Sequence, residues 1–290
     1  MKKVAKVAGL VLAAVCVMGA SVACQSPEES NLLIGKEFLA ATSQLDALTK
    51  LDKGEADVAV IDSVMAGYYT STGDYAEKMQ IVENMVLAEE EYGIAAKKGN
   101  KAFVSKINEA LIAIRETEYA SITQEYNLTA SIALGENATD PYAGATDNSW
   151  EEVKESGTII IGYTIFAPIA YENEEGVLTG YDIELAKAVV AYLNQQYTLS
   201  LQVQFVEIDW NTKEAKLEDG TIDLVWNGMT ITPERSAGMC ISIPYLYNKQ
   251  VAVVLKTDAT KFTDKESMAE AIMTAEKGSA GESVIVPMEE

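Results

Sequence analysis

The residues best suited to bind a ligand lie between Asp209 and Arg235, in the segment DWNTKEAKLEDGTIDLVWNGMTITPER. Its apolar IDLVW run predicts a buried strand that leads into an Asn-Gly turn. Pro233 is typical of the first residue of a helix, and Thr232 is typical of its N-cap. An Arg in the first turn of a helix can hold an anion, because its guanidinium binds a carboxylate through two parallel hydrogen bonds. The alternative is a capped helix whose Arg235 forms only a surface ion pair.

Asp62 is a second candidate, because it ends the apolar run DVAVI at residues 57–61. Open α/β sheets place ligand-binding groups at the carboxyl ends of their strands. Phe166 is a third, in the loop that follows the strand-like run TIIIG at 158–162. The structural alternatives are a helix cap for Asp62 and ordinary packing for Phe166.

The segment EKGSAGES at residues 276–283 is rich in small residues. Gly278 and Gly281 would let backbone N–H groups come close to a ligand. A plain Gly/Ser turn is the alternative.

The composition excludes several functions. The chain has 290 residues, with 22 Lys and Arg against 44 Asp and Glu, and its net charge of −22 would repel nucleic acid. It has no histidine, which rules out Ser-His-Asp and Cys-His catalysis and histidine-bound metals. We expect no cofactor. The length and the apolar fraction of 48% suit one large domain or two smaller ones.

Residues 1–23 are expected to be a signal peptide for export. Three lysines precede an apolar run that is too short for a confident membrane span, and small residues follow it. The sequence Ser21-Val-Ala-Cys24 resembles a bacterial lipobox, with Cys24 as the lipidated residue, although Ser21 replaces the usual Leu. Ordinary secretion and a retained anchor are the alternatives. Residues 24–30 would form a tether, and Cys240 would be a buried apolar residue.

The remaining sequence predicts an α/β fold. Apolar strand-like runs at 57–61, 158–162, 203–208 and 222–226 alternate with helical periodicity at 103–114, 118–126, 183–193 and 211–220, and we expect Asp182 to cap the third helix. This alternation is typical of helices packed on largely parallel sheets. Residues 127–149 are rich in Gly, Asn and Asp and read as a linker.

Together these motifs resemble the type-2 periplasmic solute-binding proteins of ABC importers, specifically the polar amino acid group. The resemblance rests on TIIIGYTIFAPIAYENEEGVLTGYDIELAKAVV (158–190), IDWNTKEAKLEDGTIDLVWNGMTITPERS (208–236), TAEKGSAGE (274–282), LDKGEADVAVID (51–62) and EYGIAAKKGN (91–100). It implies two α/β lobes that close on a ligand between them.

The order of these motifs is rotated relative to that family, which predicts a circular permutant with linked original termini. The new chain ends should then lie close together in one lobe. A rearranged sequence and a swapped dimer are the alternatives. The expected parts are the second part of lobe 2 (31–92), the hinge and C-terminal helices of lobe 1 (93–130), a flexible linker (131–147), lobe 1 (148–257) and the first part of lobe 2 (258–290), with hinges near 251–256 and 91–95.

The resemblance also implies ligand contacts. Arg235 would bind the α-carboxylate of an amino acid, helped by the N–H groups of Thr230 and Gly281. Asp62 would bind the α-ammonium together with the Gly228 carbonyl and the Thr230 hydroxyl. The remaining positions of the expected ligand-binding set are Phe166 and Trp210, which would sandwich the side chain, and Tyr163, Lys277 and Ala280.

The implied function is an extracytoplasmic, membrane-anchored receptor that delivers a free amino acid to an ABC permease, as a monomer. Tyr163 stands where receptors for basic amino acids carry an acid, which favours a neutral polar or sulfur-containing ligand. Two other functions stay open. A cyclohexadienyl dehydratase-like enzyme would need an acid in the cleft, for which Glu282 is the nearest candidate, and a sensory module would need a membrane span and a further domain.

Overall fold

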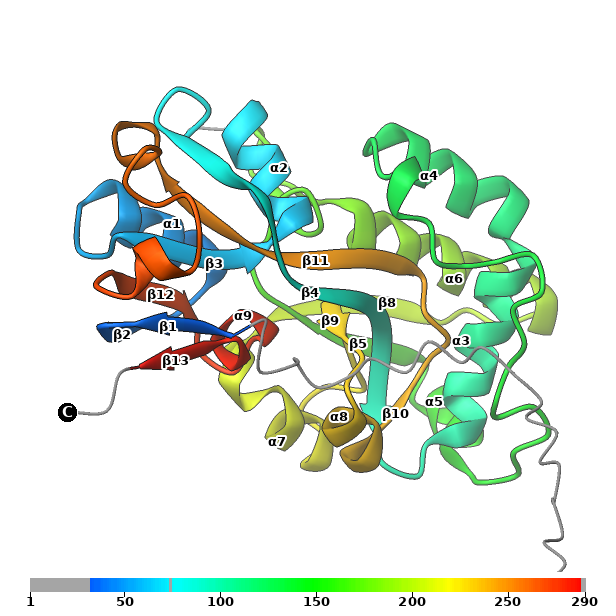
Figure 1. Ribbon diagram of the computed structural model, residues 1–290. Helices are drawn as coiled ribbons and strands as arrows, with labels where there is room; N and C mark the ends of the chain where they lie inside the picture. The colour runs from blue at the N-terminus through cyan, green and yellow to red at the C-terminus, as the bar shows by residue number, and fades with distance from the viewer. Residues whose placement is uncertain (1–31, 73–74, 288–290) are drawn as a thin grey trace, which may run out of the picture.

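The computed structural model describes residues 32–72 and 75–287 and shows an α/β fold (Figure 1). The predicted signal peptide, tether and lipidated Cys24 lie outside these residues. The strands are β1 (Leu33–Gly35), β2 (Glu37–Ala41), β3 (Val58–Asp62), β4 (Met79–Lys97), β5 (Thr158–Tyr163), β6 (Tyr171–Glu172), β7 (Leu178–Thr179), β8 (Gln202–Glu207), β9 (Leu224–Thr230), β10 (Met239–Ile241), β11 (Leu246–Leu255), β12 (Ile272–Glu276) and β13 (Ile285–Pro287).

Helices cover the sheet and follow most of the strands. The α-helices are α1 (Gln44–Asp52), α2 (Ser63–Ser71), α3 (Lys101–Ala113), α4 (Ala120–Glu125), α5 (Ser149–Ser156), α6 (Tyr181–Tyr197), α7 (Lys213–Glu218), α8 (Pro233–Gly238) and α9 (Ala280–Ser283). A π-helix spans Arg115–Tyr119, and 3-10 turns span Thr129–Ser131, Trp210–Thr212, Lys256–Asp258 and Glu266–Met268. Within the described ranges, none of these helices has the length and apolar character needed to cross a bilayer.

One mixed sheet of nine strands runs through the molecule in the order β2-β12-β3-β11-β4-β9-β5-β8, with β10 paired to β4. Its two ends are parallel, as the sequence predicted. Its centre is antiparallel, because β11 pairs with both β3 and β4, and β4 pairs with β9. We call β2, β12 and β3 with α1, α2 and α9 the β3 half, and β9, β5 and β8 with α5 to α8 the β5 half. The long strands β4 and β11 connect the two halves (Figure 1).

The first and last described strands lie side by side next to the β3 half. Strands β1 and β13 pair in parallel, with Leu33 opposite Ile285, and the Leu33 N–H donates to the Val284 carbonyl at 2.7 Å. The blue and red strands lie side by side in Figure 1. The predicted ends themselves, near Ser30 and Glu290, lie outside the described residues, but the strands next to them are paired.

The predicted linker at 131–147 is not a free tether. Leu134 is fully buried, and Asp140 accepts hydrogen bonds from Asn108 at 2.7 Å and Ser105 at 2.5 Å, both on α3. Asp147 accepts the Ala102 N–H at the start of the same helix at 2.9 Å. The expectation of flexibility was wrong because these acidic residues bind polar groups of α3.

Local signals explain the elements around the site. Thr232 caps α8 by accepting the Arg235 N–H at 3.2 Å, and Pro233 begins the helix, as predicted. Asp182 does not cap α6, whose N-cap is Gly180. Asp182 lies inside the first turn and points into the core, where it accepts the Gly228 N–H at 2.7 Å and the Tyr245 hydroxyl at 2.8 Å. Cys240 is buried, as expected.

Candidate functional site

A deep cavity lies where the two halves of the sheet meet. Its lining includes seven of the predicted ligand-binding residues: Asp62, Phe166, Trp210, Gly228, Thr230, Arg235 and Ala280. The other lining residues are Gln44, Thr164, Asn227, Glu276 and Ser279. The cavity is narrow, at about 10 Å³, which is room for about one water molecule. Residues far apart in the sequence therefore converge on one enclosed space.

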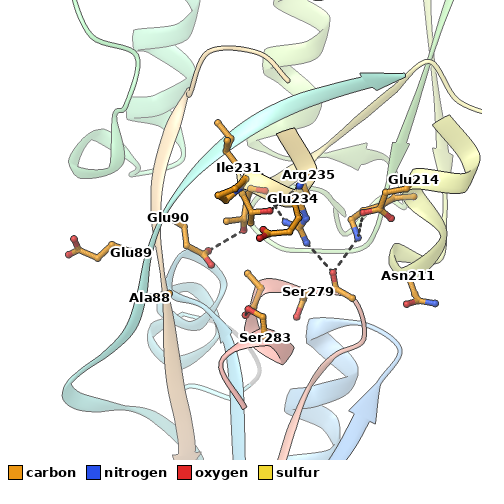
Figure 2. Close-up of a pocket in the computed structure, with 16 residues that line it drawn as sticks. Ala88, Glu89, Glu90, Asn211, Glu214, Ile231, Glu234, Arg235, Ser279 and Ser283 are labelled. Atoms are coloured by element: carbon orange, nitrogen blue, oxygen red, sulfur yellow. Dashed lines mark hydrogen bonds and ion pairs between the residues drawn. The ribbon is translucent and has the colours of Figure 1, made fainter. Parts of the chain in front are cut away.

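Arg235 reaches this space from α8 of the β5 half. Its guanidinium donates to the Thr230 carbonyl at 2.8 Å and to the Gly278 carbonyl of the β3 half at 3.0 Å. Lys213 donates to the same Gly278 carbonyl at 3.2 Å. Figure 2 shows Arg235 and Glu214 on one side and Ser279 and Ser283 on the other. Burial lowers the pKa of Arg235, yet an arginine stays charged at neutral pH.

Asp62 faces the cavity from the end of β3, as the sequence predicted for the carboxyl end of a strand. Its carboxylate accepts hydrogen bonds from the side-chain amides of Gln44, Asn248 and Gln250, the last at 2.6 Å. Burial raises its pKa to about 6, against the opposing effect of these three amides. The buried carboxylate thus has neutral donors but no cationic partner among the hydrogen bonds it makes.

Glu90 is a second buried carboxyl that the sequence analysis missed. It lies on β4, is 5% exposed, and its Oε2 accepts from Asn248 at 2.9 Å, Gln250 at 3.0 Å and Thr230 at 3.2 Å. Burial and the charge of Asp62 raise its pKa to about 7. Asn248 and Gln250 on β11 therefore connect the two carboxyl groups.

Glu276, at the end of β12, is a third buried carboxyl that was missed. It is 3% exposed, lines the deep cavity, and its Oε1 has no hydrogen-bond partner within the described residues. Burial and repulsion by Asp62 raise its pKa to about 8, although Lys213 and Arg235 oppose this. The sequence analysis included it as the first residue of the segment at 276–283 but gave it no role.

Gly228 lies on β9 with a φ of +61°, which suits glycine. A Cβ at this position would come within 2.7 Å of Phe166 Cε1. The hydrogen bond to Asp182 fixes its N–H, so its backbone lies against the Phe166 ring. The glycine therefore allows the aromatic side chain to line the cavity.

Three predicted positions do not line the deep cavity. Tyr163 packs with Ala170 and Ile183 and forms an edge contact with Phe205 at 6.4 Å between ring centroids. Lys277 is exposed, and Gly281 is buried against the Val60 carbonyl and Gln250. Their predicted ligand contacts stay predictions, without support from this cavity.

A wider cavity of about 530 Å³ adjoins the deep one and shares Thr230, Arg235, Ser279 and Ala280 with it (Figure 2). Glutamates 89, 90, 214 and 234 and Lys213 also line it. No cluster of side chains suited to a metal ion occurs among residues 32–72 and 75–287. Both cavities are therefore lined by carboxyl groups and by cationic side chains.

Comparison with known proteins finds similar sequences. Residues 159–279 match the family model for bacterial extracellular solute-binding proteins, family 3. A probable amino-acid ABC transporter-binding protein from Haemophilus influenzae is 30% identical over 45% of this chain and 47% of its own. The L-cystine-binding protein TcyJ from Escherichia coli is 29% identical over 39% of this chain and 40% of its own.

Among solved structures, a substrate-binding protein of an ABC uptake transporter from Streptococcus pneumoniae with bound histidine is similar. It is 38% identical over 32% of this chain and 35% of its own, with a TM-score of 0.28. The part of this chain that aligns covers less than half the length of each of these three proteins.

The predicted kinship and the α/β fold class are thus confirmed, and the family match includes Phe166, Trp210, Gly228, Thr230, Arg235 and Glu276. Residues 159–279 of this chain are therefore similar to the bacterial extracellular solute-binding proteins of family 3.

Proposed function

We propose that this protein is a receptor that binds one free amino acid between the two halves of its sheet. The observation that carries the proposal is that Arg235 of the β5 half and Asp62 of the β3 half line the same buried cavity. A zwitterion offers a carboxylate to the first and an ammonium to the second. Leaving either charge buried without a partner would be costly, so the site favours a molecule with both.

Binding would be coupled to movement of the halves. The deep cavity holds about one water molecule, so an amino acid enters only if the halves separate. The contacts of Arg235 and Lys213 with Gly278 cross between the halves. A ligand that contacts both halves stabilises the closed form by its difference in affinity for the closed and open forms.

The cellular role follows from the relatives. We propose that the protein is exported, lipidated at Cys24, and delivers its ligand as a monomer to an ABC permease. The family match to extracellular solute-binding proteins supports export and transport. The lipid anchor rests on the lipobox-like sequence alone.

We also propose that the chain is a circular permutant with the lobe and hinge boundaries given above. The parallel pairing of β1 with β13 supports this, because it brings residues 33–35 and 285–287 together. Residues 131–147 would then join the original termini, and their contacts with α3 make that junction part of the fold.

A second candidate is an enzyme of the cyclohexadienyl dehydratase kind. Glu282, the predicted acid, does not line either cavity and accepts the Gly278 N–H at 2.6 Å. Glu276 favours this candidate instead, since a buried carboxyl with a pKa of about 8 could donate a proton. Turnover of a cyclohexadienyl acid by the purified protein would distinguish the enzyme from the receptor.

The proposed receptor function is tested by thermal unfolding in the presence of each of the twenty amino acids and L-cystine. A ligand that binds only the folded state raises the melting temperature, by an amount that grows with its concentration. We expect at least one free amino acid to do so at micromolar concentration, and α-deaminated acids to have little effect. No shift with any of them would contradict the proposal.

A further inference from the structure

The carboxyl groups at the site outnumber the cations. Asp62, Glu90 and Glu276 are each at most 5% exposed, and the cations that line the two cavities are Arg235 and Lys213. A zwitterion adds one charge of each sign and leaves this imbalance unchanged. The three buried carboxyl groups therefore still outnumber these two cations with an amino acid in place.

The three carboxyl groups differ in the hydrogen bonds that they accept. Asp62 accepts from Gln44, Asn248 and Gln250. Glu90 accepts from Thr230 and from the same two amides of β11. The Oε1 of Glu276 accepts no hydrogen bond from the described residues, although Glu276 is 3% exposed.

Glu276 is also placed to contact the side chain of a ligand. It lines the deep cavity together with Phe166 and Trp210, and the cavity wall continues through Ser279 and Ala280 into the wider space. A buried carboxyl oxygen without a hydrogen-bond donor costs free energy, and a cationic group from the ligand would supply that donor in addition to the nearby charges of Lys213 and Arg235. Glutamates 89, 214 and 234 at the wider cavity would attract such a ligand.

Resting on the proposed function, we propose that the bound amino acid carries a second positive charge on its side chain, an ammonium or a guanidinium, and that Glu276 binds it. This differs from the neutral ligand that Tyr163 favoured in the sequence. The expectation of a neutral ligand assumed that Tyr163 contacts the ligand. Tyr163 instead packs away from the deep cavity. Glu276 would be a residue that determines specificity.

The test compares matched ligands by titration calorimetry. L-arginine and L-lysine are the cationic probes, and L-citrulline and L-norleucine are neutral molecules of similar shape. We expect the protein to bind at least one cationic probe at least tenfold more tightly than its neutral counterpart. Glu276→Gln should reduce this preference to less than threefold, and Glu270→Gln, which removes a charge from an exposed position of the same half, should keep it.

The outcomes separate the two proposals. Tight binding of citrulline, norleucine or another neutral amino acid with no preference for the cationic probes would overturn the inference and leave the receptor function intact. An equal loss of affinity for both members of a pair in Glu276→Gln would overturn the role of Glu276. Binding of no amino acid at all would overturn the receptor function and this inference together.

Discussion

Arg235 Nη2 lies 3.0 Å from the carbonyl oxygen of Gly278, and this hydrogen bond joins the two halves of the sheet. The same guanidinium holds the Thr230 carbonyl of its own half. A ligand carboxylate would offer stronger, charge-assisted hydrogen bonds to the same donors. The residue proposed to bind the ligand is therefore also one that connects the halves.

Replacement of Arg235 should abolish binding. Arg235→Ala is expected to lower the affinity for the amino acid that gives the largest thermal shift by at least about 100-fold. The reason is that the substitution leaves the ligand carboxylate without its ionic partner. Arg235→Lys should also weaken it, since a lysine cannot form the paired hydrogen bonds. Calorimetry measures both. Arg115→Ala is the matched control, because Arg115 pairs with Glu116 away from the cavities.

Gly228 should tolerate no side chain. Gly228→Ala would bring its Cβ within 2.7 Å of Phe166, and we expect a loss of unfolding free energy of about 2–4 kcal/mol from crowding and the left-handed backbone. Gly220→Ala is the control, because Gly220 also has a positive φ, +78°, but has open space around it. It should lose only about 1 kcal/mol. Urea unfolding of both variants measures the two losses of unfolding free energy. Equal losses in Gly228→Ala and Gly220→Ala would refute the crowding argument.

The stability of the protein should fall as the pH rises. The pKa values of Asp62, Glu90, Asp182 and Glu276 are raised to about 6, 7, 7 and 8 by burial, so the folded state keeps protons that the unfolded chain has already released. Unfolding free energy therefore decreases between pH 5 and pH 8.5, by up to about 1.4 kcal/mol per pH unit for each extra proton.

Thermal unfolding across this range measures the effect. Glu276→Gln should reduce the slope above pH 7, because it removes the carboxyl that the charges of Asp62, Asp209, Lys213 and Arg235 surround. A melting temperature that rises steadily from pH 5 to pH 8.5 would contradict this assignment of raised pKa values.

The sequence predicted the parts of the site that local signals specify. The Thr232 cap, Pro233 and the Arg in the first turn of α8 form a local motif, and Asp62 ends an apolar strand. The sequence could not place Glu90 beside Asn248 and Gln250, because these contacts cross between β4 and β11, about 160 residues apart in the chain. Asp182 was misread because an acid at the start of a helix usually serves as a cap, and only the fold turns it inward.

The permuted order gives another prediction. A chain that begins at residue 137, continues through 287, and is joined by a short flexible linker to residues 32–136 keeps the contacts of residues 131–147 with α3, and it should form the same fold and bind the same ligand. The pairing of β1 with β13 places the two joined ends near each other. Circular dichroism and calorimetry measure the result. A chain that fails to fold, while the original order folds, would show that the present order is required.

The central proposal is that Arg235 and Asp62 bind the two charged groups of one amino acid. Its most direct test is the ratio of the affinities for the best amino acid ligand and for its α-deaminated analogue. In the unchanged protein we expect a ratio of at least about 100, because Asp62 binds the ammonium in a buried site. In Asp62→Asn the ratio should fall below about 10, mainly through weaker binding of the amino acid. A ratio that is the same in both proteins would contradict the account.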